Sequence, residues 1–132
     1  MILIGYSGHA YVINGIFKSN GIKVTGYCDN EEKVYNPLSL TYHGSEDVEP
    51  GLGALAKGDF FIAIGDNNIR RKVYERMSTA GLHPVNAIHA SAIIDDSVSI
   101  APHAVMIAPN VTINPLAKLG IGCICNSAAV IE

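Results

Sequence analysis

Residues 94–132 read IDDSVSIAPHAVMIAPNVTINPLAKLGIGCICNSAAVIE. Apolar residues recur here at every sixth position, with one extra residue between Ile100 and Ile107. A second set of apolar or small residues follows four positions after each of the first six. The two sets are Ile94, Ile100, Ile107, Ile113, Leu119, Cys125 and Ile131, and Val98, Ala104, Val111, Ala117, Cys123 and Ala129. A period of six fits neither a simple helix nor a simple strand.

Triplets of turn-forming residues separate the two sets. They include Ala101-Pro102-His103, Ala108-Pro109-Asn110 and Asn114-Pro115-Leu116, so proline is the middle residue three times in succession. Proline fixes φ and has no N–H to donate, and prolines at this spacing exclude one continuous helix. A six-residue period of strand, turn and strand is typical of a parallel β-helix, whose coils stack on one another. The alternative, a few ordinary short strands, does not require a register that persists through six units.

Short apolar runs and amphipathic segments alternate before the repeat. Met1–Gly5 predicts a buried parallel strand, because it is apolar throughout and too short for a helix. The buried face of the helix that follows is expected to consist of Val12, Ile13, Ile16 and Phe17. Gly21 ends that helix, and Ile22–Cys28 predicts a second strand, which completes a β-α-β unit.

A third strand and a second long helix follow the polar segment 31–50. Asp59–Gly65 is the clearest buried strand, and Asp66 or Asn67 caps the next helix. Ile69, Val73 and Met77 are expected on the buried face of that helix, which ends at Gly81, and residues 82–88 predict a last strand. The fold class is therefore α/β: a small Rossmann-like parallel-sheet domain over residues 1–88, followed over residues 89–132 by the first coils of an incomplete hexapeptide-repeat β-helix.

The composition narrows the class of partner. The chain has 132 residues, a net charge of −3, 48% hydrophobic residues and 16% charged residues, which suits a folded domain. With no basic cluster we expect no nucleic-acid partner, and with no long apolar run or signal peptide we expect a cytoplasmic protein without membrane insertion. Cys123 and Cys125 both fall on inward repeat positions, where cysteine behaves as a small apolar residue, so we expect no metal site.

Candidate binding residues lie where the predicted strands end. The turn that contains Ser7, Gly8 and His9 joins the first strand to the first helix, and N–H groups at a helix N-terminus suit a diphosphate. The turn lacks the second and third glycines of the dinucleotide fingerprint, since Ser7 and Ala10 stand in their places. A tight turn without a ligand is the alternative reading.

Two further strand ends point to the same edge. Asp29 closes the second strand, where a carboxylate can accept hydrogen bonds from ribose hydroxyls or a base N–H, although an ordinary strand-end aspartate is the alternative. Gly65 ends the strand before the second long helix. Because the carboxyl ends of parallel strands share one edge, we expect these residues to border one crevice.

The chain resembles the sialic acid and bacillosamine acetyltransferases, which are left-handed β-helix acyltransferases. The residues that carry the resemblance are Gly5–Ala10, Tyr27–Asn30, Phe60–Arg70 and the repeat through Glu132. The resemblance implies that the first domain binds a UDP-sugar through Ser7, Gly8 and His9, through Asp29 and Asn30 at the uracil, and through Gly65. Asn30 stands where the family has a second acid.

The resemblance also implies an activity and an assembly. The closest likeness is to the N-acetyltransferase that modifies the 4-amino group of a UDP-amino-dideoxy sugar in bacterial glycan synthesis. Acetyl-CoA is then the co-substrate and lies between the subunits of a homotrimer. In the family a catalytic His follows a stretch like Asn126–Glu132, so we expect this chain to end just before the general base, to contain no catalytic residue, and to bind UDP-sugar without turning it over.

Three other functions stay open. A sialic acid O-acetyltransferase belongs to the same class and would label a hydroxyl instead of an amine. A small NAD-binding oxidoreductase would need the glycines that are missing from the turn. A non-catalytic sugar-nucleotide-binding module would bind the nucleotide and transfer nothing.

Overall fold

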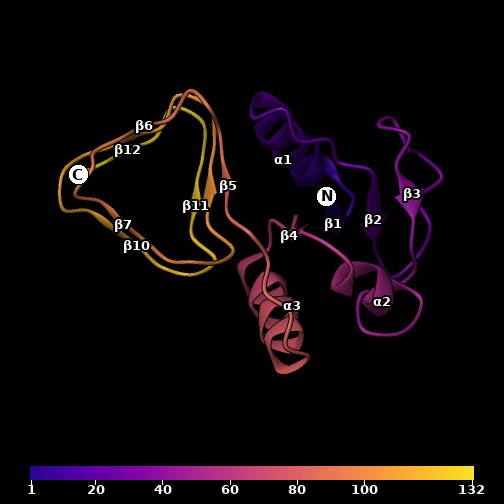
Figure 1. Ribbon diagram of the computed structural model, residues 1–132. Helices are drawn as coiled ribbons and strands as arrows, with labels where there is room; N and C mark the ends of the chain where they lie inside the picture. The colour runs from indigo at the N-terminus through magenta and orange to yellow at the C-terminus, as the bar shows by residue number, and fades with distance from the viewer.

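The computed structural model describes residues 1–132, and its first half is a parallel sheet between two layers of helix (Figure 1). The strands are β1 (Ile2–Ile4), β2 (Gly26–Cys28), β3 (Thr41–Tyr42) and β4 (Phe60–Ile62), in the order β3-β2-β1-β4 and all parallel. The helices are α1 (Gly8–Ser19), α2 (Gly51–Ala56) and α3 (Asn67–Thr79). None of the three is both long and apolar enough to cross a bilayer.

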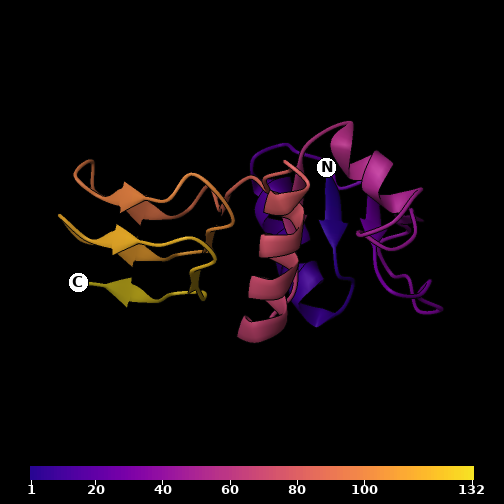
Figure 2. The same ribbon diagram turned by 90° about the horizontal axis from the view of Figure 1, so that it is seen from below.

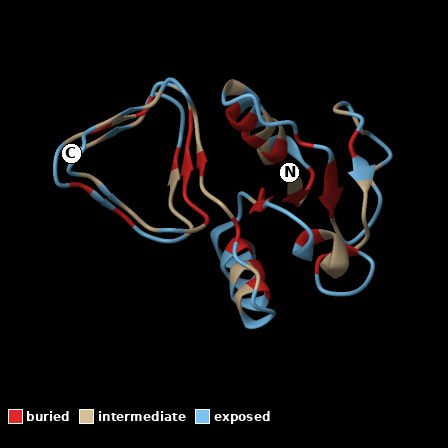
Figure 3. Cartoon of the chain, in the orientation of Figure 1, coloured by how far each residue is buried: buried red, intermediate tan, exposed pale blue.

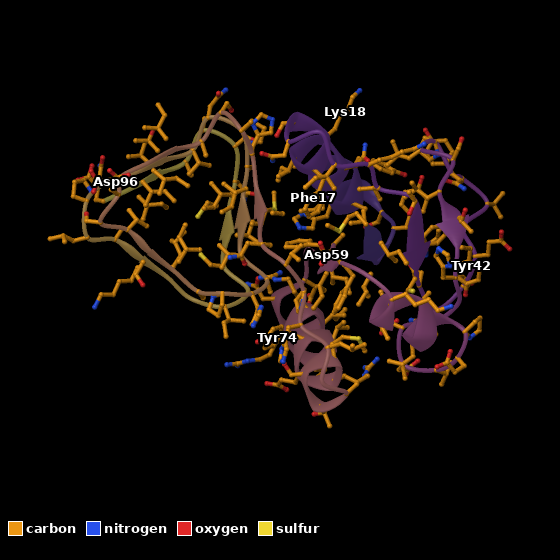
Figure 4. The ribbon with its side chains drawn as sticks, in the orientation of Figure 1. Phe17, Lys18, Tyr42, Asp59, Tyr74 and Asp96 are labelled. Atoms are coloured by element: carbon orange, nitrogen blue, oxygen red, sulfur yellow. The ribbon has the colours of Figure 1, made fainter.

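Successive strand residues face opposite layers, as the two-residue period of a strand requires. On one face Leu3, Tyr27 and Phe61 join a core that contains the inner residues of α1. Phe17 points from α1 toward the sheet, with its ring centroid 6.0 Å from that of Phe61, while Lys18 points away from it (Figure 4). On the other face Ile4, Cys28, Phe60 and Ile62 pack with Leu55 of α2 and with Val73 and Met77 of α3.

The sequence predicted where the helices begin and end better than it predicted which of their residues are buried. Asp66 caps α3, and its Oδ1 accepts hydrogen bonds from the N–H groups of Asn68 and Ile69, both at 2.9 Å. The prediction that Val12 and Ile69 are buried is wrong: they are 42% and 53% exposed. Ala10 and Arg70 take the inner positions instead.

The second half is a left-handed parallel β-helix in the form of a three-sided prism, and its coils stack as Figure 2 shows. Its strands are β5 (Ala87–Ile88), β6 (Ile93–Ile94), β7 (Ser99–Ile100), β8 (Met106–Ile107), β9 (Thr112–Ile113), β10 (Lys118–Leu119), β11 (Ile124–Cys125) and β12 (Val130–Ile131). They form the parallel sheets β5-β8-β11, β6-β9-β12 and β7-β10. Most residues at the corners are exposed, while β8 and the inward residues of the middle coil are buried (Figure 3).

Residues 82–88 do not form a last strand of the first sheet. Only Ala87 and Ile88 are extended, and they pair with Met106 and Ile107 of β8. The first coil of the prism therefore begins within the range that we expected to belong to the α/β unit. A strand of two residues is too short to show a periodic pattern in the sequence, which explains why the start of the first coil was not recognised.

From Ala104 onward, each prism corner places one residue in the left-handed region of φ. Asn110, Leu116 and Ala128 have φ of 59°, 68° and 61°, and Gly122 has 74°. Serines one coil earlier accept the corner N–H groups: Ser97 Oγ accepts from Leu116 N at 2.9 Å. This geometry favours glycine or asparagine, because a Cβ crowds the carbonyl oxygen.

The two halves share one hydrophobic core. The cluster that contains Leu3 and Phe61 continues through Met106 and Ile107 to Ile113 inside the prism. At the end of α1, Asn20 Nδ2 donates to the carbonyl of Ile88 at 2.8 Å, and Ser19 Oγ accepts from Ala90 N at 3.0 Å. Helix α1 therefore lies between the sheet and the prism and packs against both.

Replacing Leu116 by asparagine should stabilise the chain. The side chain is 76% exposed and φ is 68°, so little packing is lost and the left-handed strain is relieved. We expect the free energy of unfolding to rise by about 1 kcal/mol, measured by urea denaturation. Lys118→Asn, at an exposed strand position two residues away, should give no gain. A Leu116→Asn variant less stable than the wild type would contradict the assignment of the corner.

Candidate functional site

The turn after β1 leaves three backbone donors free. The N–H groups of Ser7, Gly8 and His9 have no acceptor within the chain, and Ser7 adopts an extended conformation without capping α1 through its side chain. Gly5 sets the direction of the turn: its φ is +90°, and a Cβ built on it would lie 2.9 Å from Cγ1 of Ile64 and 3.1 Å from the carbonyl oxygen of Ala63. The turn therefore presents unpaired N–H groups at the positive end of the α1 dipole.

Helix α3 starts at the same edge but is already capped. The carboxylate of Asp66 accepts hydrogen bonds from N–H groups in the first turn of α3, so a negative charge already lies at the start of this helix. Of the two long helices that begin at the carboxyl edge of the sheet, only α1 lacks an acceptor for its first N–H groups. At this edge the free N–H donors therefore lie at the turn of Ser7, Gly8 and His9 and not at the start of α3.

Asp29 ties the end of β2 to the turn. Its Oδ2 accepts from Tyr6 N at 3.1 Å and lies 3.4 Å from the ammonium of Lys33, and its Oδ1 accepts from Asn30 N at 2.8 Å. The carboxylate is half-buried, whereas Asn30 is exposed and its side-chain amide makes no hydrogen bond within the chain. Asp29 therefore joins two strand ends, and Asn30 presents a free donor and acceptor beside them.

Tyr6 fixes the loop that borders this edge. Its hydroxyl donates to Asn36 Oδ1 at 2.7 Å and accepts from Leu38 N at 3.0 Å, and burial raises the pKa of the phenol. Its ring lies 4.5 Å from that of Tyr27, which in turn lies 5.3 Å from that of Tyr42 (ring centroids). A row of tyrosines thus supports both the turn and the loop.

Gly65 lies against His9. A Cβ built on Gly65 would be 3.9 Å from Cβ and Cγ of His9, so the ends of β1 and β4 meet there. His9 Nε2 is the only buried side-chain nitrogen or oxygen without a hydrogen-bond partner. Burial, and next the charge of Arg70, lower the pKa of His9, so its imidazole is neutral at pH 7.

Arg70 is the residue of this site that the sequence reading missed. It is only 8% exposed and sits on the inner face of α3 with Val73 and Met77. Its position three residues before Val73 and seven before Met77 is a helical spacing that could have revealed it, but the neighbouring Ile69 is the more apolar choice. Arginine is rarely buried without a reason.

A cavity between α3 and the prism lies beside the turn rather than at it. Its volume is about 440 Å³, and it is lined by α3 residues, Arg70 and Tyr74 among them, and by the prism residues Ala104, Ile121 and Gly122. Ser7, Gly8, His9, Asp29, Asn30 and Gly65 do not line it. The free donors at the turn define the candidate site more clearly than the size of this cavity, because they specify the chemistry of a ligand. No group of three or more His, Cys, Asp or Glu residues is placed to hold a metal ion.

Solved structures share this arrangement over nearly the whole chain. A mutant of perosamine N-acetyltransferase from Caulobacter crescentus, in complex with CoA and GDP-perosamine, is 30% identical with a TM-score of 0.86, over 98% of this chain and 61% of that one. The acetyltransferase domain of PglB from Neisseria gonorrhoeae, in complex with acetyl coenzyme A, is 21% identical with a TM-score of 0.81, over 98% of this chain and 62% of that one. An uncharacterized protein of Acanthamoeba polyphaga mimivirus is 31% identical over 100 residues, which are 74% of this chain and 19% of that protein. The chain thus spans less than two thirds of each of these relatives.

The fold has the architecture of the sugar acetyltransferases: a Rossmann-like α/β unit followed by a left-handed β-helix. The family model described as the PglD N-terminal domain matches residues 1–77, from the start of the chain to the last turn of α3. The chain belongs to this family.

Removing the Tyr6 hydroxyl should loosen the loop at the site. Tyr6→Phe leaves the N–H of Leu38 and the side chain of Asn36 without their shared partner, so we expect a loss of about 1–3 kcal/mol in the free energy of unfolding. Tyr35→Phe, at a mostly exposed ring in the same loop, is the control and should change nothing. Chemical denaturation measures both, and equal stability of the two variants would show that the Tyr6 hydroxyl does not anchor the loop.

Proposed function

We propose that this chain is the nucleotide-sugar-binding part of an acetyl-CoA-dependent sugar N-acetyltransferase. The single observation that carries the proposal is the set of free N–H groups of Ser7, Gly8 and His9 at the start of α1. Asp29, Asn30 and Gly65 complete the substrate site at the same edge. The proposal is supported by the likeness to perosamine N-acetyltransferase, a structure that contains CoA and GDP-perosamine.

The diphosphate of the ligand binds at the turn. Three N–H donors and the helix dipole stabilise an anion there without a cationic side chain in contact. Gly8 is exposed and has nothing within 4 Å of the place a Cβ would take, so the backbone is open to approach. The Nε2 atom of the neutral His9 lies in the same turn and has no hydrogen-bond partner within the chain. A ligand at the turn would give this histidine a role.

The base binds beside Asp29 and Asn30. An amide side chain offers one donor and one acceptor, which matches the N3–H and O4 edge of uracil. Guanine presents the same pair at N1–H and O6 but adds a 2-amino donor, for which this amide has no second acceptor atom. The carboxylate of Asp29 is already engaged by Tyr6 and Asn30, so base selection falls to Asn30 and favours UDP over GDP.

The reaction is a direct acyl transfer. Acetyl-CoA supplies the acetyl group as a thioester: the amine nitrogen of the sugar bonds to the thioester carbon, the C–S bond breaks, CoA leaves as the thiolate, and a base removes a proton from the nitrogen. Ser7, Gly8 and Gly65 hold and orient the nucleotide so that the sugar points away from the turn. The six site residues therefore bind the substrate, and none of them transfers the acetyl group.

A homotrimer completes the proposed enzyme. Ile93, Thr112 and Val130 stand in register on the outer side of β6-β9-β12, and Ile93 and Val130 are mostly exposed. Exposed apolar residues aligned across coils fit a contact between prisms. Acetyl-CoA would lie between neighbouring subunits of that assembly.

Calorimetry with the 132-residue chain tests the nucleotide preference. We expect UDP to bind, GDP to bind at least tenfold more weakly, which corresponds to about 1.4 kcal/mol, and NAD not to bind. We also expect no transfer from labelled acetyl-CoA to a UDP-4-amino sugar by this chain. Tighter binding of GDP than of UDP would reverse the assignment of the base, and NAD binding without UDP binding would overturn the acetyltransferase proposal.

A carboxylate placed in the turn tests the diphosphate site. Gly8→Asp fits sterically and puts a negative charge beside the free N–H groups, so we expect UDP affinity to fall at least tenfold with little change in Tm. Gly15→Asp is the matched control, because Gly15 is exposed in the same helix, has the same open surroundings and carries the same change of charge. Equal UDP affinity of the two variants would place the diphosphate elsewhere.

A further inference from the structure

Arg70 is a buried cation without a counter-ion. Its guanidinium is bound only by uncharged acceptors, and no carboxylate lies within ion-pair distance of it. Asp66 lies close enough to act on the guanidinium through its charge, but its Oδ1 is committed to the N–H groups that begin α3. A charge removed from water and left unpaired is costly, so its persistence calls for a function or a ligand.

All five N–H donors of Arg70 are already used. Nη1 donates to the carbonyls of Ile64 at 3.1 Å and Gly65 at 2.9 Å, and Nη2 donates to Asn67 Oδ1 at 2.7 Å. Nε and Nη2 both donate to the carbonyl of Gly122, at 3.2 Å and 3.0 Å. With no donor left, Arg70 cannot bind a ligand by a hydrogen bond, and it acts through position and charge alone.

The position of Arg70 connects the edge of the sheet to the prism. It holds the end of β4, where Gly65 packs against His9, and it holds a prism corner at Gly122. Its charge reaches the turn as well, since it is the one charged group that depresses the pKa of His9. The free N–H groups of α1 and this cation therefore act on the same small region.

We propose that Arg70 is a positioning residue of the nucleotide site that supplies its net positive charge, and that the diphosphate of the ligand is the anion that balances it. This inference rests on the proposed function and deepens it: the turn recognises phosphate groups by shape and hydrogen bonds, and Arg70 makes the affinity rise with their number. It also supplies a positive charge to an anion site in a chain whose net charge is −3.

A ligand series separates charge from shape. The affinities of uridine, UMP and UDP are measured by calorimetry for the wild-type chain and for Arg70→Gln, Arg70→Lys and Arg71→Gln. For Arg70→Gln we expect uridine affinity to change less than twofold, UMP affinity to fall a few-fold and UDP affinity to fall at least tenfold. Arg70→Lys keeps the charge and should restore most of the UDP affinity. Arg71→Gln is the matched control, because this neighbour has an 80% exposed side chain and should leave all three affinities unchanged.

A second measurement does not depend on the folding of Arg70→Gln. In the wild-type chain the ring protons of His9, followed by NMR, should titrate below the ordinary value of about 6.5, and saturating UDP should raise that pKa because an anion now balances Arg70. An unchanged His9 titration overturns the inference. So does Arg70→Gln if it weakens uridine and UDP by the same factor, because Arg70 would then be merely structural. A wild-type chain that binds no UDP overturns the proposed function itself, whereas wild-type UDP affinity that survives in Arg70→Gln overturns only the role of Arg70.

Discussion

The packing of α1 between the sheet and the prism sets the geometry of the whole molecule. One side of the helix meets β1, β2 and β4 through residues such as Phe17, and its end is bonded to the first coil at Ile88 and Ala90. The same helix begins at the turn that carries the free N–H groups. Because packed interiors have a density close to that of organic crystals, α1 has little freedom to shift, and the direction of those donors is fixed relative to both halves.

Electrostatics at the carboxyl edge are divided among three elements with different roles. Asp66 caps the start of α3, Asp29 joins the ends of β1 and β2, and Arg70 places a positive charge without a paired carboxylate behind the turn. A second carboxylate near His9 would cancel the attraction for a phosphate group, and an exposed lysine there would attract anions without selecting their geometry. The positive charge of Arg70 and the free N–H donors of the turn therefore belong to different elements, α3 and the start of α1.

The sequence predicted features that repeat or that follow local rules. The period of six fixes which side chains enter the prism, and Asp66, Gly21 and Gly81 mark helix ends by their own chemistry. The common edge of Ser7, Asp29 and Gly65 follows from parallel topology alone. The bond from Arg70 to Gly122 spans 52 positions and joins two kinds of structure, so no local pattern encodes it. A shift of one position on a helix separates Ile69 from Arg70, and apolar character pointed to the wrong one of the two.

The one irregularity of the repeat has a structural cause at the junction of the two halves. The extra residue between Ile100 and Ile107 falls in a corner that faces the α/β unit, where Ala104 takes a φ of 62° and is buried. Asn86 satisfies this corner by donating to Ala101 O at 2.8 Å and accepting from Val105 N at 2.9 Å, and the rings of His83 and His103 stack beside it at 4.7 Å. The corner one coil later contains Gly122, the partner of Arg70. The prism thus departs from its period on the side where it must fit the α/β unit, and it stays regular where it meets only its own coils.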